Sequence, residues 1–130
     1  MSTRSSNGTP HRVAVVGGGN MGATYTNDYI EIFNSSGSAV NVTGWSVQYA
    51  SSTGTPWQAT ALAGSIPSGA YYLIQEAAGS GGTTALPTPD ATGSIAMSGT
   101  SGKVSLVNTT TAQSGSCPSG SQIIDTVGYG

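Results

Sequence analysis

The sequence predicts an all-β fold, a sandwich or barrel of about seven to nine short strands. Three observations lead to this fold class. Apolar and polar residues alternate with a period of two in short runs such as residues 45–50, as in half-buried strands. Gly, Ser and Thr fill the segments between the runs, and Gly alone numbers 20. Charged residues make up only 6% of the chain, which does not fit the highly charged composition of disordered chains.

Nine strands are expected in chain order. They span residues 12–16, 29–34, 40–42, 45–50, 56–62, 71–75, 93–97, 103–107 and 123–127. Residues 76–92 and 109–120 are expected to be long irregular segments, with only a faint helical signal at 76–78. Residues 1–11 are polar and predict a flexible leader, so the predicted β-sandwich domain spans residues 12–130.

The alternation within residues 45–50 predicts a strand with two different faces. We expect Trp45, Val47 and Tyr49 to point into the core, and Ser46 and Gln48 to point the other way.

The remaining large aromatic residues are candidates for an interaction surface. They are Trp57, Tyr71 and Tyr72, whose faces the alternation does not fix. Aromatic rings stack on sugars, so one interpretation is that these three side chains form a carbohydrate-binding surface. The favoured interpretation is that they pack in the core, because aromatic side chains dominate core burial.

Charge and hydropathy exclude two function classes. The net charge is −2, and the only Lys and Arg residues are Arg4, Arg12 and Lys103. These cations are too few and too scattered for phosphate binding, so we expect no nucleic-acid binding by this domain alone. No apolar run approaches the roughly 18–20 residues of a membrane span. The first residues lack the apolar region of a signal peptide, so we expect either an intracellular protein or a mature fragment of a secreted one. The Ser/Thr/Gly-rich composition, with a single Lys, favours an extracellular or cell-surface location.

Two motif matches lack the context that their function requires. Gly17-x-Gly19-x-x-Gly22 has the spacing of a dinucleotide-binding loop, but no helix pattern follows it. Residues 126–130 spell the filter sequence of potassium channels, but a filter needs pore helices in a membrane. We interpret this second match as a strand end followed by a Gly-Tyr-Gly turn.

No group of residues predicts catalysis, a metal site or a cofactor. His11 is the sole histidine and lies close to the predicted leader, which is a poor place for a catalytic base. Cys117 has no cationic neighbour in sequence that would activate its thiol. The five acidic residues do not have the spacing of a calcium loop. A non-enzymatic protein without metal or cofactor is therefore expected.

The chain resembles the lamin tail domain, in its bacterial extracellular branch. The resemblance rests on Asn27-Asp28-Tyr29-Ile30-Glu31-Ile32-Phe33-Asn34, Thr43-Gly44-Trp45-Ser46-Val47, Ile66-Pro67-Ser68-Gly69-Ala70-Tyr71-Tyr72-Leu73 and the closing Ile124-Asp125-Thr126-Val127-Gly128-Tyr129-Gly130. It implies an immunoglobulin-like β-sandwich with a core of Ile30, Ile32, Trp45, Val47, Leu73, Val104 and Leu106. It carries over no catalytic residues. Family members often supply a second cysteine for the one at Cys117, so an intermolecular or truncated disulfide is a candidate role for this thiol.

Three functions follow as expectations. The first is a non-catalytic interaction or accessory module of a secreted or cell-surface protein, with a protein partner or an attached domain. The second is a structural subunit that assembles with itself by β-strand pairing, because open sheet edges are templates for pairing. The third is a carbohydrate-binding module that uses Trp57, Tyr71 or Tyr72.

Overall fold

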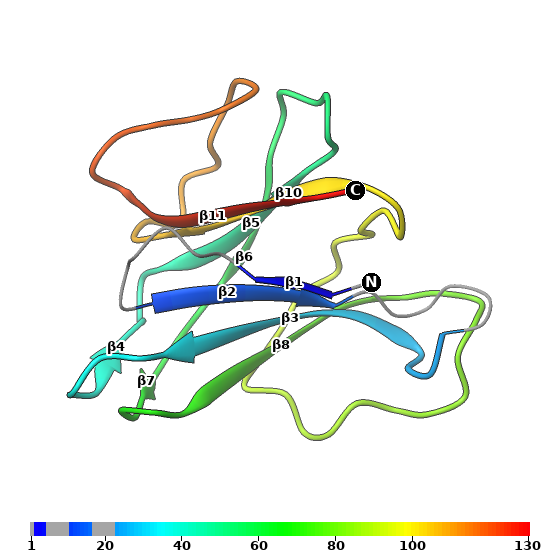
Figure 1. Ribbon diagram of the computed structural model, residues 1–130, viewed down its shortest axis with the longest axis horizontal. Coiled ribbons are helices and arrows are strands. Elements are labelled where there is room, and N and C mark those ends of the chain that lie inside the picture. Colours follow the sequence, from blue (N-terminus) through cyan, green and yellow to red (C-terminus); the bar gives the residue numbers. More distant parts are fainter. Residues whose placement is uncertain (1, 5–10, 17–22) are drawn as a thin grey trace.

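A computed structural model describes residues 2–4, 11–16 and 23–130, and these residues form eleven β-strands without a helix. The predicted all-β fold is confirmed. Two sheets lie face to face as the layers of a sandwich (Figure 1). This architecture is consistent with the immunoglobulin-like sandwich that the resemblance implies.

The first sheet has the strand order β1-β2-β3-β8-β9. Its members are β1 (Ser2–Arg4), β2 (His11–Val16), β3 (Asn27–Asn34), β8 (Tyr71–Ala78) and β9 (Ala91–Thr92). Neighbouring strands are antiparallel, except that β9 runs parallel to β8. Every second residue of β3 and β8 is buried, so one face of this sheet packs on the core and the other is partly open.

The second sheet has the strand order β11-β10-β5-β6 and is antiparallel throughout. Its members are β11 (Ile123–Tyr129), β10 (Gly102–Val107), β5 (Ser46–Ala50) and β6 (Gln58–Ala61). A short pair of strands, β4 (Val40–Asn41) and β7 (Ser65–Ile66), lies at one end of the sandwich (Figure 1).

The hydrophobic core lies between the two sheets. Its largest fully buried apolar side chains are Ile30, Ile32, Val42, Val47, Ile66, Ile74, Val104, Leu106 and Val107. Six of the residues expected in the core are confirmed there, namely Ile30, Ile32, Val47, Tyr49, Val104 and Leu106. Trp45 is only half-buried at the core margin. The expectation for Leu73 is wrong, because β8 buries Tyr72, Ile74 and Glu76 and turns Leu73 to the other face.

Both faces of β5 are buried, which corrects the expectation of one polar exposed face. Ser46 and Gln48 have no exposed surface. The loop that follows β10 covers them: Ser46 donates to the carbonyl of Thr109 at 2.6 Å, and Gln48 Nε2 donates to that of Thr111 at 2.9 Å. Gln48 Oε1 accepts from the amide of Gln113 at 2.8 Å. These hydrogen bonds make burial of the polar side chains tolerable.

Two other element predictions are wrong. Strand β8 continues through Glu76–Ala78, although the sequence predicts an irregular segment with a faint helical signal there. The strand expected at residues 93–97 is absent, since β9 ends at Thr92. The backbone amides of Ile95 and Met97 bond to carboxylates of Glu76 and Asp28 instead of to a neighbouring strand. We call residues 93–98 the crossing segment.

The chain ends also differ in part from expectation. Ser2–Arg4, within the predicted leader, pair with β2 as β1, and the backbone of His11 begins β2 opposite Asn34. The rest of the leader and the segment Gly17-x-Gly19-x-x-Gly22 lie outside the described residues. Strand β11 continues to Tyr129, so the expected Gly-Tyr-Gly turn is wrong. Tyr129 pairs with Gly102 and donates its hydroxyl to the carbonyl of Ser98 at 2.6 Å.

Candidate functional site

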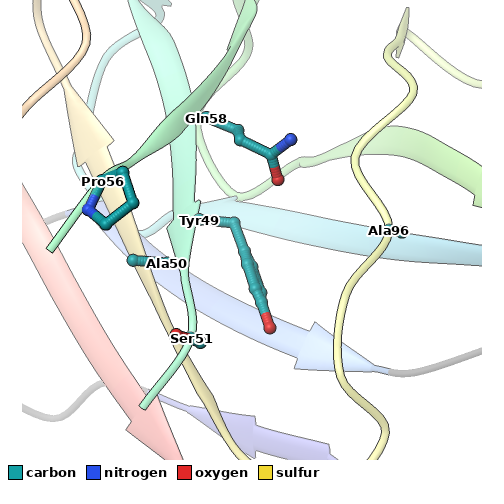
Figure 2. A pocket seen from close by; sticks show the side chains of 6 residues that line it. All are labelled: Tyr49, Ala50, Ser51, Pro56, Gln58 and Ala96. Atoms are coloured by element: carbon teal, nitrogen blue, oxygen red, sulfur yellow. The ribbon is translucent and has the colours of Figure 1, made fainter. Parts of the chain in front are cut away.

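An open groove of about 430 Å³ lies beside β6, at the edge of the second sheet. It is lined by Tyr49, Ala50, Ser51, Pro56, Gln58 and Ala96. Figure 2 shows the side chains of Tyr49 and Gln58 extending from β5 and β6 toward the segment that carries Ala96. The groove therefore lies between the edge of the second sheet and the crossing segment.

The backbone of β6 presents hydrogen-bonding groups along this edge. The amide of Leu62 donates to the carbonyl of Trp45 at 2.9 Å, so Thr60 and Gln58, two and four residues earlier, also bond to β5. The N–H and C=O groups of Ala59 and Ala61 then point away from β5. No hydrogen bond joins them to another residue in the described part of the chain. Both alanines are exposed, and β6 carries no charged residue.

The crossing segment is held to both sheets by polar side chains. Met97 donates its amide to Asp28 Oδ2 at 2.8 Å, and Ile95 donates its amide to Glu76 Oε1 at 3.2 Å. On the side of the second sheet, the amide of Ser98 donates to the hydroxyl of Tyr49 at 3.0 Å. Burial raises the pKa of Tyr129, so its hydroxyl stays protonated as the donor to the carbonyl of Ser98. One wall of the groove is therefore fixed in place.

Glu76 is a buried carboxyl group, 1% exposed, behind the groove. Its oxygens accept from the hydroxyl of Thr60 and from the amide of Ile95. Burial raises the pKa of Glu76, and the nearby carboxylate of Asp28 raises it further, while the two hydrogen bonds act in the opposite direction. All of these donors belong to the domain itself, so we interpret Glu76 as a structural residue that joins β8 to β6 and to the crossing segment.

Trp57 is 6% exposed and lies under the loop after β10. Its indole Nε1 donates to the carbonyl of Gly115 at 2.9 Å. The ammonium group of Lys103 lies 5.4 Å from the centre of its ring and donates to the carbonyls of Gly54 and Ser116. Both contacts order the two loops around the ring. Trp57 therefore offers little surface to a ligand.

Tyr71 and Tyr72 lie on opposite faces of β8. Tyr72 is 4% exposed, and its hydroxyl donates to the carbonyl of Ala63 at 2.8 Å and accepts from the same residue's amide. Tyr71 is 56% exposed and packs on Phe33 with ring centres 4.8 Å apart. Its role in binding stays a prediction. Cys117 is a free, exposed thiol.

A family model of the lamin tail domain matches residues 6–130. The chain belongs to the lamin tail domain family. No curated protein and no solved structure showed a significant match to it. The family is one of immunoglobulin-like domains that are not themselves enzymes, which agrees with the sandwich described above.

Two negative findings apply to the described part of this lamin tail domain. No three His, Cys, Asp or Glu side chains gather closely enough there to hold a metal ion. Within residues 2–4, 11–16 and 23–130, no helix is long and apolar enough to cross a bilayer.

No pattern in the sequence indicates the side chains that shape the groove. Gln58 and Ala96 stand in runs without a clear period, and Glu76 was placed in an irregular stretch. In the folded chain the alternating burial of β8 continues through Glu76, which lies two residues after Ile74 on the core face. Residues 71–74 are all apolar, so no period of two in the sequence could have found Glu76.

Proposed function

We propose that this lamin tail domain is a non-catalytic interaction module of a secreted or cell-surface protein, and that the edge of β6 pairs with an extended segment of a protein partner. The outward N–H and C=O groups of Ala59 and Ala61 carry the proposal, because an open edge accepts a further strand through main-chain hydrogen bonds.

The surroundings of this edge support strand addition. Natural sheets protect their edges with Lys, Pro, bulges or covering segments. Strand β6 has the sequence Gln-Ala-Thr-Ala, with no charge and no Pro within it. The adjacent groove, with the side chains of Tyr49 and Gln58, would receive alternate side chains of an added strand. The main-chain hydrogen bonds would supply affinity, and the groove would supply selectivity for the side chains of the partner.

A test is selection of peptides from a random display library against the folded chain. The informative variant is Ala59→Pro, which removes one outward N–H, while the hydrogen bonds between β5 and β6 stay in place. Ala59→Ser is the matched control. Selected peptides should bind the wild type and Ala59→Ser equally, and Ala59→Pro at least about tenfold more weakly. Equal binding to all three proteins would reject the edge as the binding surface.

Self-assembly is the second candidate, because the same uncharged edge could pair with a second copy of the chain. Light scattering coupled to size exclusion, over a concentration series, separates the two candidates. A mass that stays near 12.8 kDa favours the module that binds other proteins. A mass that grows with concentration, and no longer does so in Ala59→Pro, favours the structural subunit.

A further inference from the structure

The loop after β10 already lies against the backbone that leads into the β6 edge. Pro56, two residues before β6, forms an antiparallel bridge with Ser114, and the amide of Gly115 donates to the carbonyl of Thr55 at 2.9 Å. Thr55 lies four residues before Ala59, so by the alternation of an antiparallel strand both point away from β5. The loop therefore blocks an added strand before the start of β6, and it lies there as an antiparallel neighbour.

The hydroxyl of Tyr72 occupies the other end of this edge. It accepts from the amide of Ala63 at 3.2 Å and donates to the carbonyl of the same residue at 2.8 Å. Ala63 lies two residues after Ala61, so its bonded groups point to the same side as the open groups of Ala61. The open edge thus has the length of β6 itself, 4 residues. A short extended segment fits this edge, whereas a longer strand would meet the loop.

Two positions of an added strand would face into the sandwich, beside Gln58 and Thr60. Residues directly opposite each other in neighbouring strands share a face of the sheet. The position beside Thr60 has little room, because the crossing segment packs there: a Cβ atom at Gly93 would overlap the hydroxyl of Thr60. We therefore expect a small residue, Gly, Ala or Ser, opposite Thr60.

The position beside Gln58 opens on the groove. Its walls include Tyr49, Pro56 and Ala96, and Figure 2 shows the side chains of Gln58 and Tyr49 extending toward Ala96. With a volume of about 430 Å³, the groove has room for an aromatic ring, which gains from packing on these walls. None of the described residues that line it is charged, so a charged side chain would lose its hydration there without a counterion. These properties favour an aromatic residue opposite Gln58.

We propose that the partner of the β6 edge is a short, uncharged protein segment that runs antiparallel to β6, with a small residue opposite Thr60 and an aromatic residue opposite Gln58. The direction follows from the sheet, since all its pairs and the bridge of Pro56 with Ser114 are antiparallel. In this direction the small residue comes two positions before the aromatic residue. The proposal rests on the proposed function and names the class of partner that this edge selects.

The test uses those display-selected peptides whose binding depends on Ala59. We expect them to share an aromatic residue two positions after Gly, Ala or Ser, with no charged residue between the two. One such peptide is then synthesised again with the small and the aromatic residue exchanged, which keeps its composition. The exchange should weaken binding at least about tenfold. Peptides that depend on Ala59 but share no such pattern, or that tolerate the exchange, would overturn the inference.

The direction of the bound peptide has a separate readout in NMR spectra. Gln58 and Thr60 bond to β5, so their pairs with an added antiparallel strand are the closely spaced, non-hydrogen-bonded ones. We expect nuclear Overhauser contacts from the Hα atom of Thr60 to that of the small residue, and from the Hα atom of Gln58 to that of the aromatic residue. The absence of these Hα pairs, or contacts in the order of a parallel strand, would contradict the assignment.

Variants at Ala96 locate the aromatic residue. Ala96 is an exposed residue of the groove wall, so Ala96→Leu fills part of the groove and leaves the β6 edge open. This variant should bind the selected peptide about five- to tenfold more weakly, and should bind its aromatic-to-alanine form as the wild type does. Ala96→Ser is the matched control and should bind both peptides normally. Unchanged binding of the aromatic peptide in Ala96→Leu, or equal loss for both peptides, would reject the groove as its site.

Failure of this inference is distinguishable from failure of the proposed function. Ala59→Pro should weaken the aromatic peptide and its alanine form alike, because it removes a main-chain contact that both make. Peptides that depend on Ala59 but ignore Ala96 would leave the edge as the binding surface and overturn the proposed partner class. A selection without any peptide that depends on Ala59 would reject both.

Discussion

The hydroxyl of Thr60 on β6 lies 2.8 Å from Oε2 and 3.0 Å from Oε1 of Glu76 on β8, so a hydrogen bond joins the two sheets behind the open edge. The same carboxyl group accepts from the amide of Ile95 in the crossing segment. One buried side chain thus connects the first sheet, the second sheet and the wall of the groove.

The raised pKa of Glu76 predicts a specific pH dependence of stability. Because its pKa is higher in the folded than in the unfolded state, the folded state binds the proton more tightly. The stabilisation is complete below the unfolded value of about 4.3 and is lost as pH rises through the folded-state pKa. Urea unfolding midpoints of wild type and Glu76→Gln, measured from pH 4 to 8, should show the wild type losing stability relative to the variant. A difference that stays constant or moves the other way would contradict this role.

Gly93→Ala should destabilise the fold at the same place. A Cβ atom at residue 93 would overlap the hydroxyl of Thr60 and the carboxyl group of Glu76. We expect a loss of about 1–3 kcal/mol in the free energy of unfolding, which is typical of overpacking. Gly37→Ala is the control, because a Cβ there meets nothing within 4 Å. Chemical denaturation of both variants checks the prediction, and equal stability of the two would refute it.

Gln48→Leu should release the loop after β10. The substitution leaves the amide of Gln113 without its partner and removes one of the two hydrogen bonds to the carbonyl of Thr111, at a cost of about 1–3 kcal/mol. Amide hydrogen exchange should accelerate at Gln113 and remain slow in β10. Gln58→Leu, on an exposed residue of β6, is the matched control. Unchanged exchange at Gln113 would show that Gln48 does not hold the loop.

The stability lost in Leu106→Ala and in Leu73→Ala should distinguish a core position from a position on the outer face. Leu106 is fully buried, so its truncation should cost about 2–5 kcal/mol through a new cavity. Leu73 borders an open pocket beside Tyr29 on the outer face of the first sheet, so its truncation should cost less than half as much. Thermal unfolding of the two variants measures the difference. Similar losses would place Leu73 in the core after all.

The fold was more predictable than the candidate site, and particular residues explain the difference. The period of two around Ile30 and Ile32, and the Gly-Trp that opens β5, are local signals that report burial on one face. The same local period assigned Gln48 to solvent, because only a loop more than 60 residues away buries it. Tyr71 and Tyr72 were grouped as candidates, yet adjacent strand residues point to opposite faces, and only one of the rings is exposed.

The groove beside β6 and the pocket beside Tyr29 arise from segments that meet only in the folded chain. Ala96 approaches Gln58 because the crossing segment is bonded to Asp28 and Glu76. Leu86 approaches Tyr29 because the loop between β8 and β9 is bonded to residues 24–26. These contacts depend on tertiary hydrogen bonds, and no spacing along the chain encodes them.

The most direct test of the central claim is amide hydrogen exchange at Ala59 and Ala61, measured in the dilute chain and again with a display-selected peptide. If β6 is an open edge that takes a partner strand, both amides exchange rapidly in the free monomer and are protected when the peptide binds. Slow exchange in the free monomer, or no protection in the complex, would contradict the assignment of this edge as the interaction surface.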